Sequence, residues 1–267
     1  SDVIVIETFR NAWRVPELRK KLLFTFFIII IYRVGGTVPV PYLDSAALSA
    51  WFEQSASSGD FFSYLNVLSG GNFSKATLLA LSVSPYINAQ IIIQLLTYAL
   101  PPLERLQKEG PEGRKKLNKI TKYASLAIAI FQAWAYYLTM KKAGACVYTE
   151  GFSKIFAEIV IIACFTAGAS LTIWLGDEIN EKGIGNGISM LLFAGIIARG
   201  PSAVIGLFDY MKTGEAKNII LVIAILVVFI LMIGFIIFMN EAERRIPIQY
   251  AKRVVGRKQY GGQNTFI

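Results

Sequence analysis

Apolar residues in this chain come in long runs separated by short polar or charged segments. The runs cover residues 22–32, 123–140, 155–175, 188–208 and 218–239. A helix needs roughly 20 predominantly apolar residues to cross the hydrocarbon core of a bilayer. Several of the runs approach that length, so the pattern predicts an all-α fold, a polytopic bundle of transmembrane helices.

The stretch 61–102 departs from this pattern because its apolar segments are short. A Gly-Gly pair opens a segment over 76–83, Ser84 and Pro85 interrupt it, and a second segment over 86–100 ends at a Pro-Pro pair. Broken helices inside membrane proteins are tolerated where protein or a water-filled cavity covers the freed backbone groups. The stretch is therefore a candidate plug or gate. The alternative is one Pro-kinked helix of roughly 40 Å over 73–100, which is possible with tilt.

The distribution of Lys and Arg tests these alternatives. If 73–100 counts as one crossing, the chain has six spans, and 19 of the 27 Lys and Arg lie on the side of the amino terminus. If 76–83 crossed the bilayer by itself, that side would hold 11 and the other 16. Cytoplasmic loops carry the excess of Lys and Arg. The count predicts a cytoplasmic amino terminus and a short half-helix that makes no crossing of its own.

Composition supports a membrane protein and excludes several kinds of chemistry. Charged residues make up 17% of the chain and hydrophobic residues 54%, whereas soluble proteins carry about 25% charged residues. The absence of histidine excludes His-ligated metals and His-based acid–base catalysis. Glu158 is the one carboxylate within an apolar run and lies near its start. Ion-coupled carriers and intramembrane hydrolases need such groups at mid-membrane. We expect no enzyme, no cofactor and no metal site.

Polar positions between and within the runs leave alternatives open. Asn88, Gln90 and Gln94 lie on an otherwise apolar helix, where they either bond neighbouring helices or line a seam that opens. The segment 103–122 is expected to be a charged loop. The Gly-rich segment 176–187 is expected to be a loop that ends in a tight turn at the next helix, since it lacks the Lys and Ser or Thr of a phosphate-binding loop.

The two ends of the chain are basic. Residues 1–21 are expected to form a cytoplasmic or interfacial helix, with a disordered tail as the alternative. The segment 241–267 is expected to be a basic cytoplasmic loop. It either anchors to the membrane surface or protrudes toward an anionic partner such as ribosomal RNA or an acidic protein groove. Its cations are Arg244, Arg245, Lys252, Arg253, Arg257 and Lys258.

Four motifs together resemble the SecY family, the channel subunit of the bacterial Sec protein translocon. They read SGGNFSKATLLAL, SPYINAQIIIQLL, GDEINEKGIGNGIS and ERRIPIQYAKRVVGRKQYGGQ, in this order along the chain. The family has ten spans in two inverted halves of five. The resemblance implies that this chain holds the first half over 22–208, a sixth span over 209–240, and a docking loop over 241–267.

The resemblance also implies the roles of the broken stretch. The half-helix, about 65–81, would be the plug, and 82–100 would be the second span and one wall of a lateral gate. The plug positions are Gly70, Gly71, Asn72, Phe73, Ser74, Lys75, Ala76, Thr77, Leu78 and Leu79. The gate positions are Asn88, Gln90, Ile91 and Gln94. The pore ring would be Val83, Ile87, Ile188 and Leu192, where the family usually has isoleucine at most positions.

The implied function is a pore that moves unfolded secretory polypeptides across the bacterial plasma membrane and inserts membrane proteins laterally into it. The implied partners are SecE, SecG, signal sequences, and the SecA ATPase or the ribosome at the six cations of 241–267, with 102–122 as a neighbouring contact. A broken-helix transporter of small solutes is the rival hypothesis, and a purely structural subunit is another. A transporter would need a coupling or substrate site at mid-membrane, and a structural subunit has no use for a plug.

Overall fold

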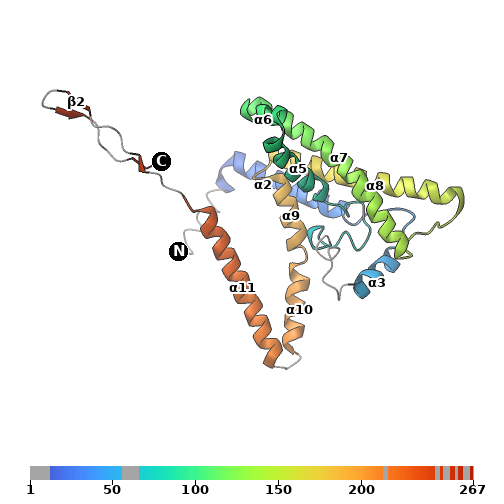
Figure 1. The fold of residues 1–267 in the computed structure, drawn as a ribbon. Coiled ribbons are helices and arrows are strands. Elements are labelled where there is room, and N and C mark those ends of the chain that lie inside the picture. The colour runs from blue at the N-terminus through green and yellow to red at the C-terminus, as the bar shows by residue number, and fades with distance from the viewer. Residues whose placement is uncertain are drawn as a thin grey trace. The chain divides into compact units, whose positions relative to one another are not determined.

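The computed structural model describes residues 13–55, 66–212 and 216–243, and four short strands that follow them. The chain divides into two compact units, Ser1–Pro201 and Ser202–Ile267. Both units are mainly helical (Figure 1), so the predicted all-α helical bundle is confirmed.

Proline begins four of the seven longer helices among the described residues of the first unit. Proline fits the first helical turn because its missing N–H would have no partner there. α2, α5, α6 and α7 all have proline at the first or second position. The helices are α2 (Pro16–Gly35), α3 (Ser45–Ser55), α5 (Ser84–Ala99), α6 (Pro101–Lys108), α7 (Pro111–Lys142), α8 (Gly151–Lys182) and α9 (Gly187–Ile197).

Two long helices organise the first unit. α7 packs against α5 and α8, and α8 also packs against α2 and α9. Small side chains lie at these contacts, including Ala129 and Ala133 of α7 and Ala169 of α8, all fully buried. Small residues let helix backbones approach closely, which is the usual basis of helix packing in membranes.

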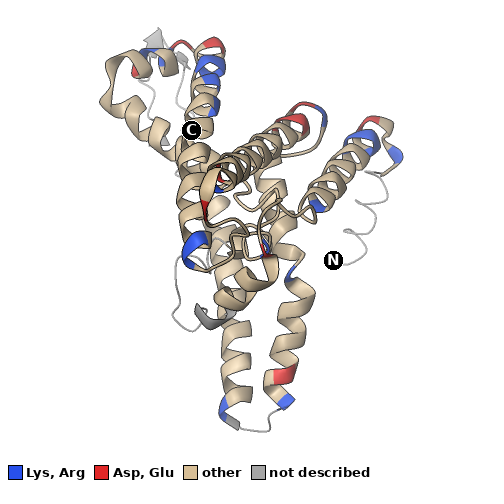
Figure 2. Cartoon of the chain, turned by 90° about the vertical axis from the view of Figure 1, so that its right-hand side faces the viewer, with Lys and Arg blue, Asp and Glu red and all other residues tan. Residues whose placement is uncertain are grey.

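Two charged segments that were predicted to be loops form parts of helices. Residues 103–122 form most of α6 and the first turns of α7, and Gly176–Lys182 extends α8, so both loop predictions were wrong. Pro101 and Pro111 start new helices, and pairs spaced i, i+4, such as Glu104 with Lys108 at 2.6 Å, support helical turns. Figure 2 shows the charged positions gathered at the helix ends, with long uncharged stretches between them.

Three of the described helices are long and apolar enough to cross a membrane. They are Gly151–Lys182, Gly187–Lys212 and Lys217–Asn240. The second comprises α9 and α10 (Gly200–Lys212), with the break at Ala198 and Arg199 that the sequence suggested. The count of six spans stays a prediction.

The second unit holds most of α10, then α11 (Ala216–Asn240), β1 (Pro247–Ile248), β2 (Arg253–Val255), β3 (Lys258–Tyr260) and β4 (Thr265–Phe266). β2 and β3 pair antiparallel, with Arg253 opposite Tyr260 and Val255 opposite Lys258, and β1 pairs with β4. The basic segment thus contains short strands that the sequence did not suggest. The other four predicted docking cations, Arg244, Arg245, Lys252 and Arg257, lie outside the described residues.

Candidate functional site

Residues 66–83, called the central segment below, form a series of turns where a half-helix was expected over 65–81. The segment is helical only over residues 66–68. Gly70, Gly71, Ala76 and Ser82 all have positive φ, between 47° and 90°. A left-handed residue cannot continue a right-handed helix. The half-helix prediction was therefore wrong for 69–81, and the helix predicted from residue 82 begins at Ser84.

The central segment forms backbone hydrogen bonds with an extended strand after α2. The Val40 N–H donates to the Ala76 carbonyl at 3.2 Å, and the Leu78 N–H donates to the Val38 carbonyl at 2.8 Å. Pro39 and Thr77 form the β-bridge between these bonds. The bridge supplies partners that a helix would otherwise have provided for the same groups.

Short polar side chains complete the hydrogen bonding of the central segment. The Asn66 amide oxygen accepts from the Ser74 N–H at 3.0 Å, and the Ser69 hydroxyl accepts from the Phe73 N–H at 3.0 Å. Ser and Asn side chains that bond nearby backbone groups compete with helix formation. This competition is the local reason why the segment adopts turns.

Tyr136 of α7 holds the middle of the central segment. Its ring stacks on Phe73 with centroids 4.2 Å apart, and its hydroxyl donates to the Phe73 carbonyl. Phe165 of α8 and Phe52 of α3 complete the aromatic cluster, at 5.0 Å from Tyr136 and 5.5 Å from Phe73. The central segment thus packs against α3, α7 and α8 through one buried aromatic cluster.

Glycines allow backbones to touch the central segment. A Cβ on Gly168 of α8 would lie 1.8 Å from the Leu78 carbonyl oxygen, and one on Gly70 would lie 2.8 Å from the carbonyl oxygen of Gly195 in α9. The Arg33 guanidinium at the end of α2 is 3.2 Å from the same position on Gly70. Only glycine fits at these contacts, so the helices enclose the segment at backbone distance.

Asn72 differs from the other polar side chains of the central segment. It is 7% exposed, and its amide nitrogen has no hydrogen-bond partner. The amide lies against Gly36, where a Cβ would be 2.8 Å from that nitrogen. A buried donor without a partner costs about 1–3 kcal/mol, so Asn72 weakens the seated conformation.

The other predicted plug positions are mostly inside the first unit. Phe73, Ala76, Thr77 and Leu79 are buried, and Lys75 is exposed. Gly70, Gly71, Ser74 and Leu78 are partly buried. Tyr136, which holds this segment, lies about 31 Å along α7 from Lys115 in the basic start of that helix, at about 1.5 Å per residue. That the detour lies on the membrane face opposite the basic residues 103–122 stays a prediction.

The predicted ring positions lie at the starts of α5 and α9. Val83 precedes α5 and is fully buried, and Ile87 in its first turn is partly buried. Ile188 is 9% exposed and packs on Gly176 of α8, and Leu192 is partly buried. The assignment of these four side chains to one ring stays a prediction.

The tight turn predicted before α9 is confirmed. Residues 183–186 connect α8 to α9, and the Asn186 side chain caps α9 by accepting from the Ser189 N–H at 3.2 Å. The Asn180 side chain accepts from the Gly187 N–H at 2.8 Å. These bonds fix the residue that precedes Ile188.

The predicted gate positions share the uncovered side of α5. Asn88, Gln90, Ile91 and Gln94 are all exposed in the first unit, whereas Ala89 and the opposite side of the helix are buried. Gln90 and Gln94 share a face of the helix and Asn88 lies apart from them, and exposed amides on an apolar helix are available to bond another helix or to line a path.

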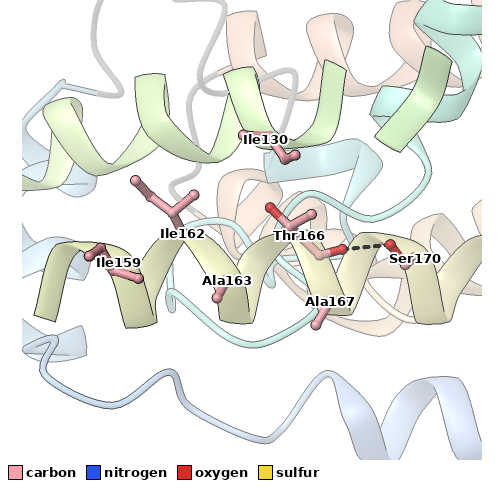
Figure 3. A pocket seen from close by; sticks show the side chains of 7 residues that line it. All are labelled: Ile130, Ile159, Ile162, Ala163, Thr166, Ala167 and Ser170. Carbon is pink, nitrogen blue, oxygen red and sulfur yellow. Dashed lines mark hydrogen bonds between the residues drawn. The ribbon is translucent and has the colours of Figure 1, made fainter. Parts of the chain in front are cut away.

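Two hollows of the first unit lie outside the central segment. The larger, about 520 Å³, lies between α7 and α8 and is lined by Ile130, Ile159, Ile162, Ala163, Thr166, Ala167 and Ser170 (Figure 3). Ser170 donates its hydroxyl to the Thr166 carbonyl at 2.9 Å. The smaller, about 320 Å³, is mainly aromatic, with Tyr42, Tyr148 and Phe156 in its wall. Neither lining contains a carboxylate or a cation, and no three potential metal ligands cluster within the part of the chain that the structure describes.

The residues of other helices that hold the central segment were not predicted from the sequence. Tyr136 and Gly168 are examples, and Tyr32 of α2, whose hydroxyl bonds the Ser82 hydroxyl at 2.8 Å, is another. Polar hydroxyls within otherwise apolar runs were the available signal. Their partners are far along the chain, so the sequence did not identify them.

Comparisons with known proteins agree on one family. The SecY family profile matches residues 77–267. The protein translocase subunit SecY of Streptomyces coelicolor is 40% identical over 98% of this chain, and that of Aquifex aeolicus is 39% identical over the same share. This chain spans 61% of the length of each of these relatives.

Solved structures share the fold at lower identity. One structure of a protein-conducting channel covers 91% of this chain and 52% of its own, with a TM-score of 0.57 and 19% identity. A SecY structure, described as showing that the plug domain stabilises the closed state of the translocation channel, has a TM-score of 0.59 and 21% identity over 91% of this chain and 52% of its own.

Proposed function

Because the chain belongs to the SecY family, we propose that it is part of the pore-forming subunit of a protein-conducting channel. The channel moves unfolded secretory polypeptides across the bacterial plasma membrane and inserts membrane proteins laterally into it. The chain is a multi-pass membrane protein with a cytoplasmic amino terminus, and it is a channel rather than an enzyme. The central segment is the observation that carries the proposal, because it is a buried, turn-rich stretch enclosed by α2, α7, α8 and α9.

The central segment acts as a movable plug. Its contacts are single hydrogen bonds, one aromatic stack and the burial of apolar side chains such as Leu79 and Leu81, and water can replace the hydrogen bonds when the segment leaves. The net contribution of each such bond is only about 1 kcal/mol, so the hydrogen bonds add little to the free-energy cost of displacement. The unpartnered amide of Asn72 lowers the cost further.

The aliphatic side chains at the starts of α5 and α9 form the seal. Val83, Ile87, Ile188 and Leu192 offer no polar group to an ion, which would have to shed its hydration without replacement. A passing polypeptide fits loosely through such a ring. The seal therefore blocks ions while tolerating many substrate sequences.

The exposed side of α5 serves as one wall of the lateral gate. A signal sequence inserts beside Asn88, Ile91 and Gln94 and opens the pore to lipid. SecE and SecG bind the channel within the membrane, and SecA or the ribosome docks on the cations of 241–267. These partners are part of the proposal for the whole protein.

The test uses the complete channel, reconstituted in planar bilayers. Replacing Val83 and Ile87 with glycine is expected to raise ion leakage, because the apolar constriction widens. Ile155→Gly, at an exposed position of α8 outside the ring and the gate, is the matched control and should leave leakage unchanged. Equal conductance in the ring variant and the control would refute the ring.

Docking and the rival hypothesis have their own measurements. Arg257→Glu should slow translocation of a secretory protein while membrane insertion of the channel stays normal, and a normal rate would refute the docking role. A stalled secretory chain should crosslink to Ile87 or Ile188. A transporter of small solutes would give no such crosslink.

A further inference from the structure

One side of α2 reaches the two segments that carry the predicted ring. Thr25, Ile28 and Tyr32 are its buried residues, at 4%, 4% and 0% exposure. Their spacing places all three on one face of the helix. The two hydroxyls, two helical turns apart, are separated by about 10 Å along the axis.

Thr25 holds the turn before α9. Its hydroxyl donates to the Lys21 carbonyl at 2.9 Å and accepts from the Ile184 N–H at 3.1 Å. Gly183 is next to this bond, and a Cβ there would lie 2.6 Å from the Thr25 hydroxyl oxygen. The turn can therefore approach α2 only with glycine at position 183. Ile188 follows the bonded residue, Ile184, by four positions.

Tyr32 holds the end of the central segment in the same manner. Its hydroxyl lies 2.8 Å from the hydroxyl of Ser82, and both side chains are buried. Ser82 has a positive φ of 48° and directly precedes Val83. The bond fixes the position of Ser82, and therefore of the backbone that carries the Val83 side chain of the predicted ring.

Apolar contacts fill the space between the two hydroxyls. Ile28 and Tyr32 belong to one buried cluster with Leu79 of the central segment and Leu191 of α9. Both segments that carry ring residues thus pack on the same strip of α2. A rigid helix that contacts both sides can set the distance between them.

We propose that α2 is the strut that sets the width of the channel constriction, with Thr25 and Tyr32 as its positioning residues. The inference rests on the proposed function, because it needs Val83 and Ile188 to face one pore. Neither hydroxyl contacts the passing chain. Each acts through the backbone that precedes a ring residue.

The experiment measures ion leakage through the complete reconstituted channel for variants that keep side-chain shape. Thr25→Val and Tyr32→Phe each remove one hydroxyl. A hydrogen bond of ordinary net strength corresponds to about a fivefold change in population, so each variant should raise leakage about fivefold. Thr25→Ser keeps the hydroxyl and should restore the original leakage.

Two matched controls separate positioning from a general loss of hydrogen bonding. Thr121→Val removes a buried hydroxyl of α7 that donates to the Leu117 carbonyl at 2.9 Å, the same local bond that Thr25 makes. Tyr137→Phe removes the hydroxyl of a buried side chain near Glu158, away from the predicted ring. Both should leave leakage unchanged. Leakage that rises equally in the controls overturns the strut.

A ring variant, Val83→Gly with Ile188→Gly, distinguishes a failure of the predicted ring from a failure of the proposed strut. If the ring variant leaks and the hydroxyl variants do not, the strut is wrong and the ring stands. If neither leaks, the ring and the strut are both wrong. Increased leakage in Thr25→Val and Tyr32→Phe, with rescue by Thr25→Ser and silent controls, supports the proposal.

Discussion

Loss of one hydroxyl from Tyr136 should loosen the central segment without disturbing its aromatic packing. Tyr136→Phe keeps the ring that stacks on Phe73 at 4.2 Å and contacts Phe165 at 5.0 Å. It removes only the hydrogen bond to the Phe73 carbonyl. That carbonyl still accepts from the Ala76 N–H at 3.3 Å, so it does not become wholly unsatisfied.

The magnitude follows from the net strength of one buried hydrogen bond. Such a bond contributes about 1 kcal/mol, and the same amount should be lost from the free energy of local opening of the segment. Local opening controls amide hydrogen exchange. Exchange of the peptide covering 73–80 should therefore be about fivefold faster in Tyr136→Phe.

The neighbouring tyrosine provides the control. The side chain of Tyr137 is as buried as that of Tyr136, with 3% exposure for each, but its hydroxyl lies near Glu158 of α8 and not at the central segment. Exchange over 73–80 should be unchanged in Tyr137→Phe. The measurement uses hydrogen exchange with mass spectrometry on the complete channel. An unchanged rate in Tyr136→Phe, or the same acceleration in both variants, would refute the claim that the Phe73 bond holds the segment.

Three further predictions use other features of the first unit. Asn72→Leu removes a buried unpartnered donor and should slow hydrogen exchange over 73–80 about fivefold or more. Asn66→Leu removes the amide oxygen that accepts from the Ser74 N–H and should accelerate this exchange; a change in the same direction in both variants would refute this. Gly168→Ala should lower the free energy of unfolding by about 2–3 kcal/mol through overpacking, while Gly206→Ala, which meets open space, should not; equal thermal midpoints would count against the close approach. Burial raises the pKa of the Cys146 thiol, and Lys141 opposes this effect, so less thiolate exists at any given pH. The rate of alkylation should therefore rise at a higher pH in the folded channel than in the denatured chain, and coincident pH profiles would contradict this.

Local signals determined much of the fold. The runs of apolar residues predicted a helical membrane protein, and the helices α2, α7, α8 and α11 contain those runs. Ser84 with Pro85 marked the start of α5, and residues 198–201 marked a break that the structure has between α9 and α10. Hydrophobic length and proline act within a few residues, so one sequence is enough to detect them.

The helix ends and the conformation of the central segment needed the tertiary structure. Charge alone suggested a loop over 103–122, but helix α7 begins at Pro111 and continues without a break into its apolar half. Apolar composition suggested a helix over 65–81, but the segment bonds the strand at 38–40 and the hydroxyl of Tyr136 instead. Propensity gives way when distant partners offer better hydrogen bonds.

The sequence by itself determined that this chain is a helical membrane protein with a broken stretch near Gly70. Only the tertiary structure decided that Tyr136, Thr25 and Tyr32 hold that stretch and the start of α9. The physical reason is distance along the chain. A hydrogen bond between residues 50 or more positions apart, such as that between Tyr32 and Ser82, leaves no periodic trace in the sequence, whereas an apolar run or a proline does.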